Sequence, residues 1–257
     1  MMPDWNPETY LAFADERARP ALDLIGRIPN RAPELVHDVG CGPGNSTGLL
    51  AEAFPGAKLT GIDSSHAMIA KAKKAVPKAQ FIVGDASEWS PNPDADLVFS
   101  NALFQWVPDH PRHLARILEA LKPGAILAVQ MPDNLKEPSH YEMAKIATKP
   151  AYSGKLQGAV RARSPLLSPQ GYHQILRPLC ARLDIWRTSY HHLLAGQQGI
   201  IDMLSSTGLR PFLDPLLPSE REHYLADYRK ALTTHYPAMD DGLVLFPFPR
   251  LFLLAVK

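Results

Sequence analysis

The sequence predicts an α/β fold built on a mostly parallel sheet, and three observations support this. Short apolar segments alternate with helical patterns, as in a parallel sheet covered on both faces. The first apolar segment runs directly into a glycine-rich loop, and several segments end in a polar side chain. The predicted strands lie near 35–40, 58–63, 80–84, 96–101 and 125–131.

The glycine loop follows the first strand. Gly40, Gly42 and Gly44 allow a sharp turn and the close approach of a ligand. The residues Asn45-Ser-Thr47 are expected to cap the next helix, whose positive end would face that ligand. The dinucleotide fingerprint G-x-G-x-x-G requires glycine where this chain has Asn45. The loop therefore predicts a nucleotide cofactor other than a nicotinamide dinucleotide.

Polar residues close three of the following strands. Asp63 stands about twenty residues beyond the loop, where a Rossmann-type unit binds ribose hydroxyls with an acid. Asp85 and Asn101 end the third and fourth strands. An ordinary strand-end turn is the alternative role for Asp85. The ends of these parallel strands predict a ligand site along one edge of the sheet.

Two helices and a final pair of strands complete the predicted core. Asp109 is expected to cap a helix whose apolar stripe, Leu114, Ile117, Leu118 and Leu121, packs on the sheet. A second helix is expected from Pro169 to Leu179. The last pair of strands is predicted at Arg182–Ser189 and Arg250–Lys257.

The connection between these last strands, Tyr190 to Pro249, is far longer than the 2–5 residues usual for a hairpin loop. A capping box at Ser219-Glu-Arg-Glu222 introduces a helical pattern there. We therefore expect a single domain with a helical cap closing over the carboxyl ends of the strands. The predicted core covers about 30–135, 165–189 and 250–257, and the predicted cap covers 1–29, 136–164 and 190–249.

Composition limits the functional classes. The chain has 257 residues, of which 46% are hydrophobic, and its net charge of +1 argues against a nucleic-acid partner. Cys41 and Cys180 lack metal-ligand spacing, so neither a zinc site nor a disulfide framework is indicated. Neither a signal peptide nor an apolar membrane span is evident. We expect a cytoplasmic monomer without a bound metal.

These motifs resemble the seven-strand S-adenosylmethionine-dependent methyltransferases over roughly residues 34–131. Further segments, such as Asp4-Trp-Asn-Pro-Glu-Thr-Tyr10, Gln105-Trp-Val-Pro-Asp-His110 and Phe248-Pro-Arg-Leu-Phe252, are similar to the trans-aconitate 2-methyltransferase family. The resemblance implies S-adenosyl-L-methionine as cofactor, S-adenosyl-L-homocysteine as product, and a Rossmann-like sheet of seven strands, mostly parallel with an antiparallel last strand. It also implies esterification of one carboxylate of a small tricarboxylic acid.

The resemblance and the strand ends together give the candidate cofactor site. Asp63 should accept the ribose hydroxyls, because a carboxylate offers two oxygens. Asp85 and Ala86 should face the adenine, and Asn101 through Phe104 should hold the methionine part. The complete predicted set is Asp38, Gly40, Gly42, Gly44, Asn45, Asp63, Ser64, Met68, Asp85, Ala86, Asn101 and Phe104.

The predicted acceptor shapes the rest of the site. A carboxylate is already ionised at pH 7, so no catalytic base is expected, and arginine forks should anchor the other carboxylates. Any one of these arginines could instead be solvated or paired with a nearby acid. The predicted substrate residues are Tyr10, Arg17, Trp106, Arg187, Tyr190, His191, Arg210 and Arg250, with Arg161, Arg163 and His192 as further candidates.

Three other functions remain open at this point. A methyltransferase of the same fold could act on another small acid, or on a neutral hydroxyl or amine that would need a base such as His191 or His192. A non-catalytic module could bind S-adenosylmethionine and contact a protein partner through its cap. A nicotinamide dehydrogenase is the least consistent with Asn45.

Overall fold

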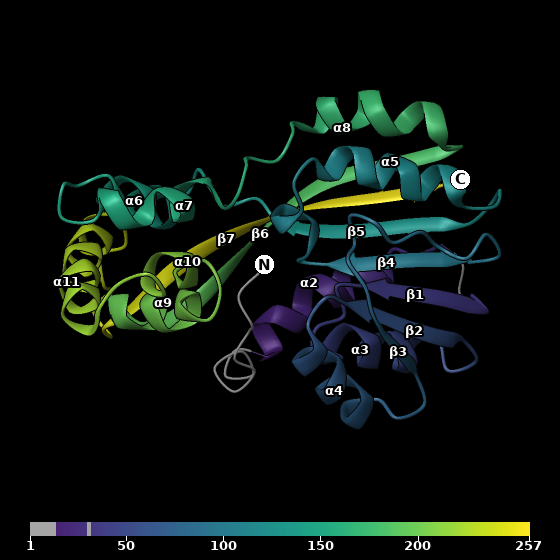
Figure 1. The fold of residues 1–257 in the computed structure, drawn as a ribbon, viewed down its shortest axis with the longest axis horizontal. Helices are drawn as coiled ribbons and strands as arrows, with labels where there is room; N and C mark the ends of the chain where they lie inside the picture. The colour runs from purple at the N-terminus through teal and green to yellow at the C-terminus, as the bar shows by residue number, and fades with distance from the viewer. Residues whose placement is uncertain (1–13, 30–31) are drawn as a thin grey trace. The chain divides into compact units, whose positions relative to one another are not determined.

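The computed structural model describes residues 14–29 and 32–257, with side chains from residue 18 onward. The chain divides into two compact units (Figure 1). Unit 1 contains the described residues up to Pro132, together with Leu166–Thr188 and Arg250–Lys257. Unit 2 contains Asp133–Pro165 and Ser189–Pro249. Residues 14–29 thus fall in unit 1, whereas the sequence grouped them with the cap.

In the described part of the chain, seven strands form one sheet in the order β3-β2-β1-β4-β5-β7-β6. The first five strands pair in parallel, and β7 runs antiparallel to β5. The predicted fold class is therefore confirmed. The strands are β1 (Leu35–Val39), β2 (Lys58–Asp63), β3 (Gln80–Val83), β4 (Leu97–Asn101), β5 (Ile126–Pro132), β6 (Arg182–Ala195) and β7 (Leu243–Val256).

Helices cover both faces of the sheet in unit 1. Figure 1 shows α5 and α8 on one face and α2, α3 and α4 on the other, and α2 contacts both α3 and β5. These elements are α2 (Ala14–Gly26), α3 (Asn45–Ala53), α4 (His66–Ala75), η1 (Phe104–Trp106), α5 (His110–Ala120), α8 (Pro169–Leu176) and η2 (Arg177–Leu179).

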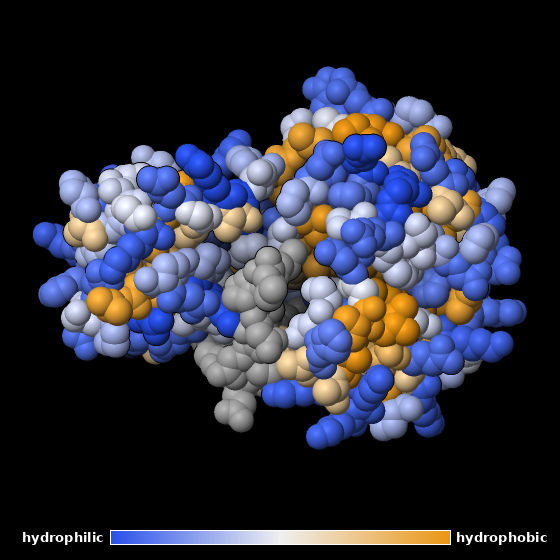
Figure 2. Space-filling model, in the orientation of Figure 1, coloured by the Kyte–Doolittle hydropathy of each residue, from blue (hydrophilic) through white to orange (hydrophobic). Residues whose placement is uncertain are grey.

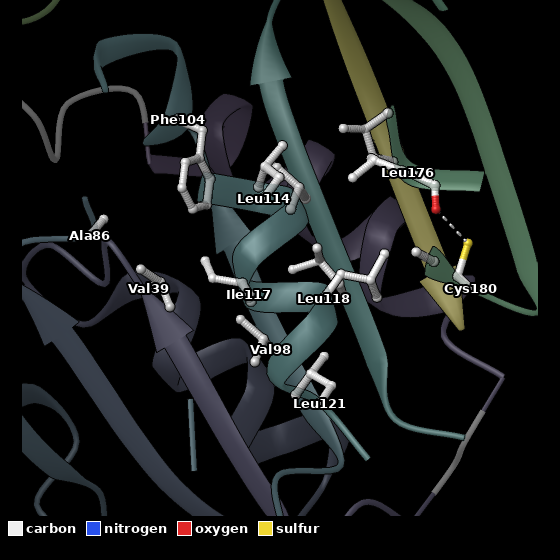
Figure 3. Packing of buried hydrophobic residues seen from close by; sticks show 14 of the residues in the cluster. Val39, Ala86, Val98, Phe104, Leu114, Ile117, Leu118, Leu121, Leu176 and Cys180 are labelled. Carbon is white, nitrogen blue, oxygen red and sulfur yellow. Dashed lines mark hydrogen bonds between the residues drawn. The ribbon is translucent and has the colours of Figure 1, made fainter. Parts of the chain in front are cut away.

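The stripe predicted on α5 packs into the main core of unit 1 (Figure 3). Leu114, Ile117 and Leu118 are fully buried, facing strand residues such as Val98. The predicted N-cap position of Asp109 is confirmed, but its side chain does not cap the helix. Asp109 occupies the N-cap position with a left-handed φ of 50° and makes no side-chain capping bond. Capping side chains usually start from an extended backbone, which places their oxygen near the first helical N–H groups.

The last two strands are longer than predicted, and only 196–242 lies between them. The pattern of β6 continues past Ser189, because Tyr190, His192 and Leu194 alternate in burial with exposed neighbours. In β7 the prolines 247 and 249 conceal the strand, since proline is depleted within sheets. The predicted bounds Arg182–Ser189 and Arg250–Lys257 therefore describe only parts of β6 and β7.

Unit 2 consists of helices around the distal parts of β6 and β7. The helices are α6 (Pro138–Ala147), α7 (Ser153–Arg161), α9 (Gly196–Ser205), α10 (Arg210–Leu213) and α11 (Pro218–His235). Helix α11 packs against α6 and α9. Two fully buried tyrosines of α11 join it to α6: Tyr224 donates to the carbonyl of Met143 at 2.9 Å, and Tyr228 donates to the carbonyl of Ser139 at 3.1 Å.

The capping box expected at Ser219–Glu222 is wrong, because α11 begins two residues earlier than that box requires. Leu217 is the N-cap residue, and its N–H donates to Glu220 Oε2 at 2.8 Å. Pro218 opens the helix, where its missing N–H leaves no helical hydrogen bond unmade. The helical insertion itself is present as predicted.

The surface is mostly hydrophilic on the face shown in Figure 2, with hydrophobic residues in small groups. Within residues 14–29 and 32–257, no helix is both long and apolar enough to cross a membrane. The same described residues contain no cluster of three metal-binding side chains.

Candidate cofactor and substrate site

The glycine loop joins β1 to α3 through three left-handed residues. Gly40, Gly42 and Gly44 have φ angles of 78°, 55° and 98°. A Cβ on Gly40 would lie 2.6 Å from the Cβ of Leu103, so that glycine is needed for packing as well as for φ. A Cβ on Gly42 would meet nothing within 4 Å, which leaves open space beside the loop. The loop therefore combines a rigid turn with room for a ligand.

Asp63 lies at the end of β2 and is tied to that loop. Its Oδ2 accepts from the N–H of Gly42 at 3.0 Å, and its Oδ1 accepts from the N–H of Ser65 at 2.9 Å. Burial raises the pKa of Asp63, and the two backbone hydrogen bonds oppose that shift. Each oxygen retains a lone pair, so both can still accept a ribose hydroxyl. The geometry fits the predicted ribose-binding role.

Asp38, near the end of β1, accepts hydrogen bonds from the start of α3, which the local sequence could not indicate. Ser46 Oγ and Thr47 Oγ1 both donate to Asp38 Oδ2, at 2.7 and 2.6 Å. The predicted capping by Asn45, Ser46 and Thr47 is therefore wrong, and Gly44 is the N-cap of α3 without a side-chain bond. Burial raises the pKa of Asp38 to about 6. Its Oδ1 has no hydrogen-bond partner among the described residues.

The adenine candidates lie after β3. Asp85 is exposed, and its Oδ1 accepts from both the N–H and the hydroxyl of Ser87, each at 2.8 Å. These hydrogen bonds lower the pKa of Asp85. Ala86 is buried. Asp85 thus forms the strand-end turn that was the alternative to a cofactor role. Its Oδ2 takes no part in these two hydrogen bonds. The predicted contact of Asp85 with adenine stays a prediction.

The segment after β4 is conformationally unusual. Ala102, directly after Asn101, has a left-handed φ of 59°, which costs a non-glycine residue free energy. Its N–H donates to the carbonyl of Gln130 at 2.9 Å, and its carbonyl accepts from Gln105 Nε2 at 2.6 Å. The Oδ1 of Asn101 is buried and has no partner within the described part of the chain. Asn101 is thereby held with a free acceptor at the strand end.

Three further cofactor candidates are Phe104, Met68 and Ser64. Phe104 is fully buried in the main core, so only its backbone can face a ligand (Figure 3). Met68 is buried in α4, and Ser64 is exposed just before that helix. The helix is capped by Ser65, whose Oγ accepts from the N–H of Met68 at 3.3 Å.

The predicted substrate residues fall into three groups. Tyr10 and the side chain of Arg17 lie outside the described residues. In unit 1, Trp106 is half-buried, Arg187 is exposed on β6 and Arg250 is buried on β7. Each of these three has an interaction partner. Arg250 Nη1 donates to Gln130 Oε1 at 3.4 Å.

The remaining candidates belong to unit 2. Tyr190 is buried and His191 is exposed, because consecutive residues of β6 point to opposite faces. Arg210 forms an ion pair with Asp214 at 3.2 Å. Arg163 donates to Asn134 Oδ1 at 3.2 Å, and burial lowers the pKa of Arg163 to about 10.

One functional candidate, Gln130, was missed by sequence reasoning. Gln130 is a single amide within an otherwise apolar strand, which is the signal that could have identified it. Gln130 pairs in register with Asn101 and is bonded to Arg250, so it connects a predicted cofactor residue with a predicted substrate residue.

Comparison with known proteins identifies relatives along the whole chain. Residues 36–124 match the family model described as a methyltransferase domain. A trans-aconitate 2-methyltransferase of Rhodopseudomonas palustris (strain BisB5) is 48% identical over 100% of both chains. The enzyme of the same name from Shigella dysenteriae is 46% identical over 99% of this chain and 98% of its own.

Solved structures agree on the fold. The YcgJ protein from Bacillus subtilis superposes with a TM-score of 0.62 at 11% identity, covering 93% of this chain and 98% of its own. Phosphoethanolamine N-methyltransferase 2 from Haemonchus contortus, in complex with S-adenosyl-L-methionine, gives a TM-score of 0.56 at 21% identity, covering 93% and 52%. With its glycine loop, strand-end acids and full-length relatives, the chain belongs to the trans-aconitate 2-methyltransferase family.

Proposed function

We propose that this protein transfers a methyl group from S-adenosylmethionine to one carboxylate of trans-aconitate, forming a monomethyl ester. The observation that carries the proposal is the full-length similarity, at 48% identity, to enzymes named for this reaction. The local geometry supports it, because Asp63 and the open space beside Gly42 suit a ribose-bearing cofactor.

The residues present fit this cofactor. Asp63 would accept the ribose hydroxyls, and the loop of Gly40, Gly42 and Gly44 would allow the ligand to approach the backbone. Asn101 Oδ1 offers an acceptor that an ammonium group could satisfy. When bound, S-adenosylmethionine supplies an electrophilic methyl group on a positively charged sulfur.

The acceptor chemistry requires orientation of the substrate and no proton removal. A carboxylate with a pKa of about 4 is ionised at pH 7 and is already a nucleophile. Holding that oxygen in line with the methyl group is worth about 7–11 kcal/mol in favourable cases. The protein's task is therefore to orient the acid and exclude water.

Anchoring of the remaining carboxylates is assigned to arginines. Arg250 suits this role, because its side chain is buried. It lies on β7 opposite Pro132, the last residue of β5, at the end of the sheet where Asn101 and Gln130 lie. Arg187 and Arg210 stay candidates, together with Trp106, Tyr190 and His191.

We also propose that the protein acts as a cytoplasmic monomer without a nucleic-acid partner. The balance of 27 basic and 26 acidic residues supports the last point. Light scattering at working concentration would test the oligomeric state, and a dimer mass would contradict the proposal.

The reaction is tested by measuring S-adenosylhomocysteine release with trans-aconitate, cis-aconitate, citrate and isocitrate in parallel. We expect a strong preference for trans-aconitate. Preference for another acid would retain the methyl-transfer chemistry and replace the substrate. Cofactor binding without turnover on any acid would favour the non-catalytic alternative.

A further inference from the structure

A buried amide at the carboxyl end of β5 is incompletely hydrogen-bonded. Gln130 is fully buried, and its neighbours Val129 and Met131 are apolar core residues. Its Oε1 accepts from Arg250 Nη1 at 3.4 Å. Its Nε2 has no partner among the described residues. An unpaired buried N–H group is costly, so the site favours a ligand atom that accepts a hydrogen bond.

The orientation of this amide is fixed by chemistry. A guanidinium group has only donors, so the amide must turn its oxygen toward Arg250. The NH₂ group of Gln130 then faces away from Arg250 as a donor. A flipped amide would place donor against donor and is excluded by the same argument. The pair therefore presents hydrogen-bond donors to a ligand: the NH₂ group of Gln130 and the guanidinium N–H groups of Arg250.

The sheet register places the pair beside the predicted cofactor residue. Gln130 is the parallel partner of Asn101, and Arg250 is the antiparallel partner of Pro132. Directly paired residues project to the same face of a sheet, so these side chains share one face at the carboxyl ends of β4 and β5. Ligands of open α/β sheets bind at such ends.

The hydrogen-bonding capacity differs between the two neighbouring amides. Asn101 retains an unpaired acceptor, Oδ1, whereas Gln130 retains an unpaired donor, Nε2. An acceptor suits a positively charged or hydroxyl donor of a ligand. A donor beside a guanidinium suits an anion, and a planar carboxylate can accept from both at once. The two positions thus favour ligand groups of opposite character.

We propose that Gln130 and Arg250 together form a carboxylate-binding subsite for the acid substrate. Gln130 orients the guanidinium through Oε1 and donates from Nε2 to the bound carboxylate. This proposal rests on the proposed function and names the groups that anchor a carboxylate not undergoing methylation. Gln130 is then a substrate-binding residue rather than a packing residue of the strand.

Two variants of the full-length protein test the subsite. Gln130→Glu replaces the NH₂ group by a charged oxygen beside Arg250, and Gln130→Met removes the polar group at similar size. We expect both to raise the KM for trans-aconitate about 10- to 100-fold, the loss typical of one hydrogen bond to a charged group. The KM for S-adenosylmethionine should remain unchanged. Gln80→Glu, an exposed change of the same type on β3, is the matched control.

Competitive inhibition by three dicarboxylates distinguishes binding from general damage. Itaconate, mesaconate and cis-glutaconate each resemble trans-aconitate without one of its three carboxylates. We expect the Gln130 variants to weaken inhibition by analogues that fill the subsite and to leave at least one analogue almost unaffected. An equal loss for all three acids, or a parallel loss for S-adenosylmethionine, would mean a structural role and overturn the proposal.

Wild-type behaviour separates the two claims. A wild-type enzyme without turnover on any acid contradicts the proposed function itself. Wild-type turnover of trans-aconitate with unchanged KM in both variants contradicts the subsite alone. Thermal unfolding and S-adenosylhomocysteine binding identify a misfolded variant, and the other Gln130 variant then decides.

Discussion

In unit 1, polar atoms at the ends of strands keep hydrogen-bonding capacity, whereas in unit 2 buried hydroxyls support neighbouring helices. Asp38 Oδ1, Asn101 Oδ1 and Gln130 Nε2 have no partner among the described residues. In unit 2, by contrast, the hydroxyls of Tyr224 and Tyr228 bond to carbonyls of α6. The difference indicates that unit 1 presents groups to a ligand, while the buried tyrosines of unit 2 maintain its shape.

The largest effect on the ligand-binding side of this comparison is expected from Asp63→Ala. The change removes both proposed ribose contacts and the support of Gly42, and each hydrogen bond to a charged group is worth about 1.5–3 kcal/mol. We expect S-adenosylhomocysteine affinity, measured by calorimetry, to fall about a hundredfold or more. A folded variant with near-normal affinity would remove Asp63 from the cofactor site.

Gly40→Ala should reveal how tightly the loop of unit 1 is packed. The new Cβ would lie 2.6 Å from that of Leu103, on a residue with a φ of 78°. Overpacking and left-handed strain together should cost about 3 kcal/mol of unfolding free energy. Gly56→Ala is the control, because nothing lies within 4 Å of its Cβ position. Equal stabilities of the two variants in urea would contradict this explanation.

The pH dependence of stability should have opposite signs in the two units. Burial raises the pKa of Asp38 in unit 1 from 3.8 to about 6. The folded state then binds more protons than the unfolded state, so this contribution to stability decreases as pH rises from about 4 to 6. In unit 2, burial and the nearby charge of Arg163 lower the pKa of His140 from 6.5 to about 3. The contribution of His140 to the free energy of unfolding therefore decreases as pH falls below 6.5.

Asp38→Asn and His140→Gln isolate these two contributions. The free energy of unfolding of Asp38→Asn, taken relative to wild type, should increase by about 2–3 kcal/mol between pH 4 and pH 6. The free energy of unfolding of His140→Gln, taken relative to wild type, should increase by about 2 kcal/mol as pH falls from 6.5 to 5. Urea unfolding at each pH gives these differences, and a pH-independent difference for either variant would contradict the corresponding assignment.

Tyr228→Phe is expected to have the smallest effect, and to act on stability alone. The change leaves the carbonyl of Ser139 without its hydroxyl donor inside unit 2, which should cost about 1–2 kcal/mol. S-adenosylhomocysteine affinity should be unchanged. Tyr141→Phe, at a side chain that is 57% exposed, should cost almost nothing. Loss of cofactor affinity in Tyr228→Phe would weaken the division of roles.

Sequence reasoning succeeded where structure depends on short-range pattern. The strand-to-glycine-loop junction and the stripe of α5 are local, and both are present in the structure. The bonds from Ser46 and Thr47 to Asp38 were missed, because capping was the local alternative for the same side chains. The pairing of Gln130 with Arg250 joins residues 120 positions apart, which no local pattern reports.

The measurement that tests the account most directly is the kcat/KM for trans-aconitate compared with that for cis-aconitate, with the product identified by mass. We predict a clear preference for trans-aconitate and a product heavier by one methylene group, carried as an ester. Equal kcat/KM values for the two isomers, or no ester with either, would contradict the assignment.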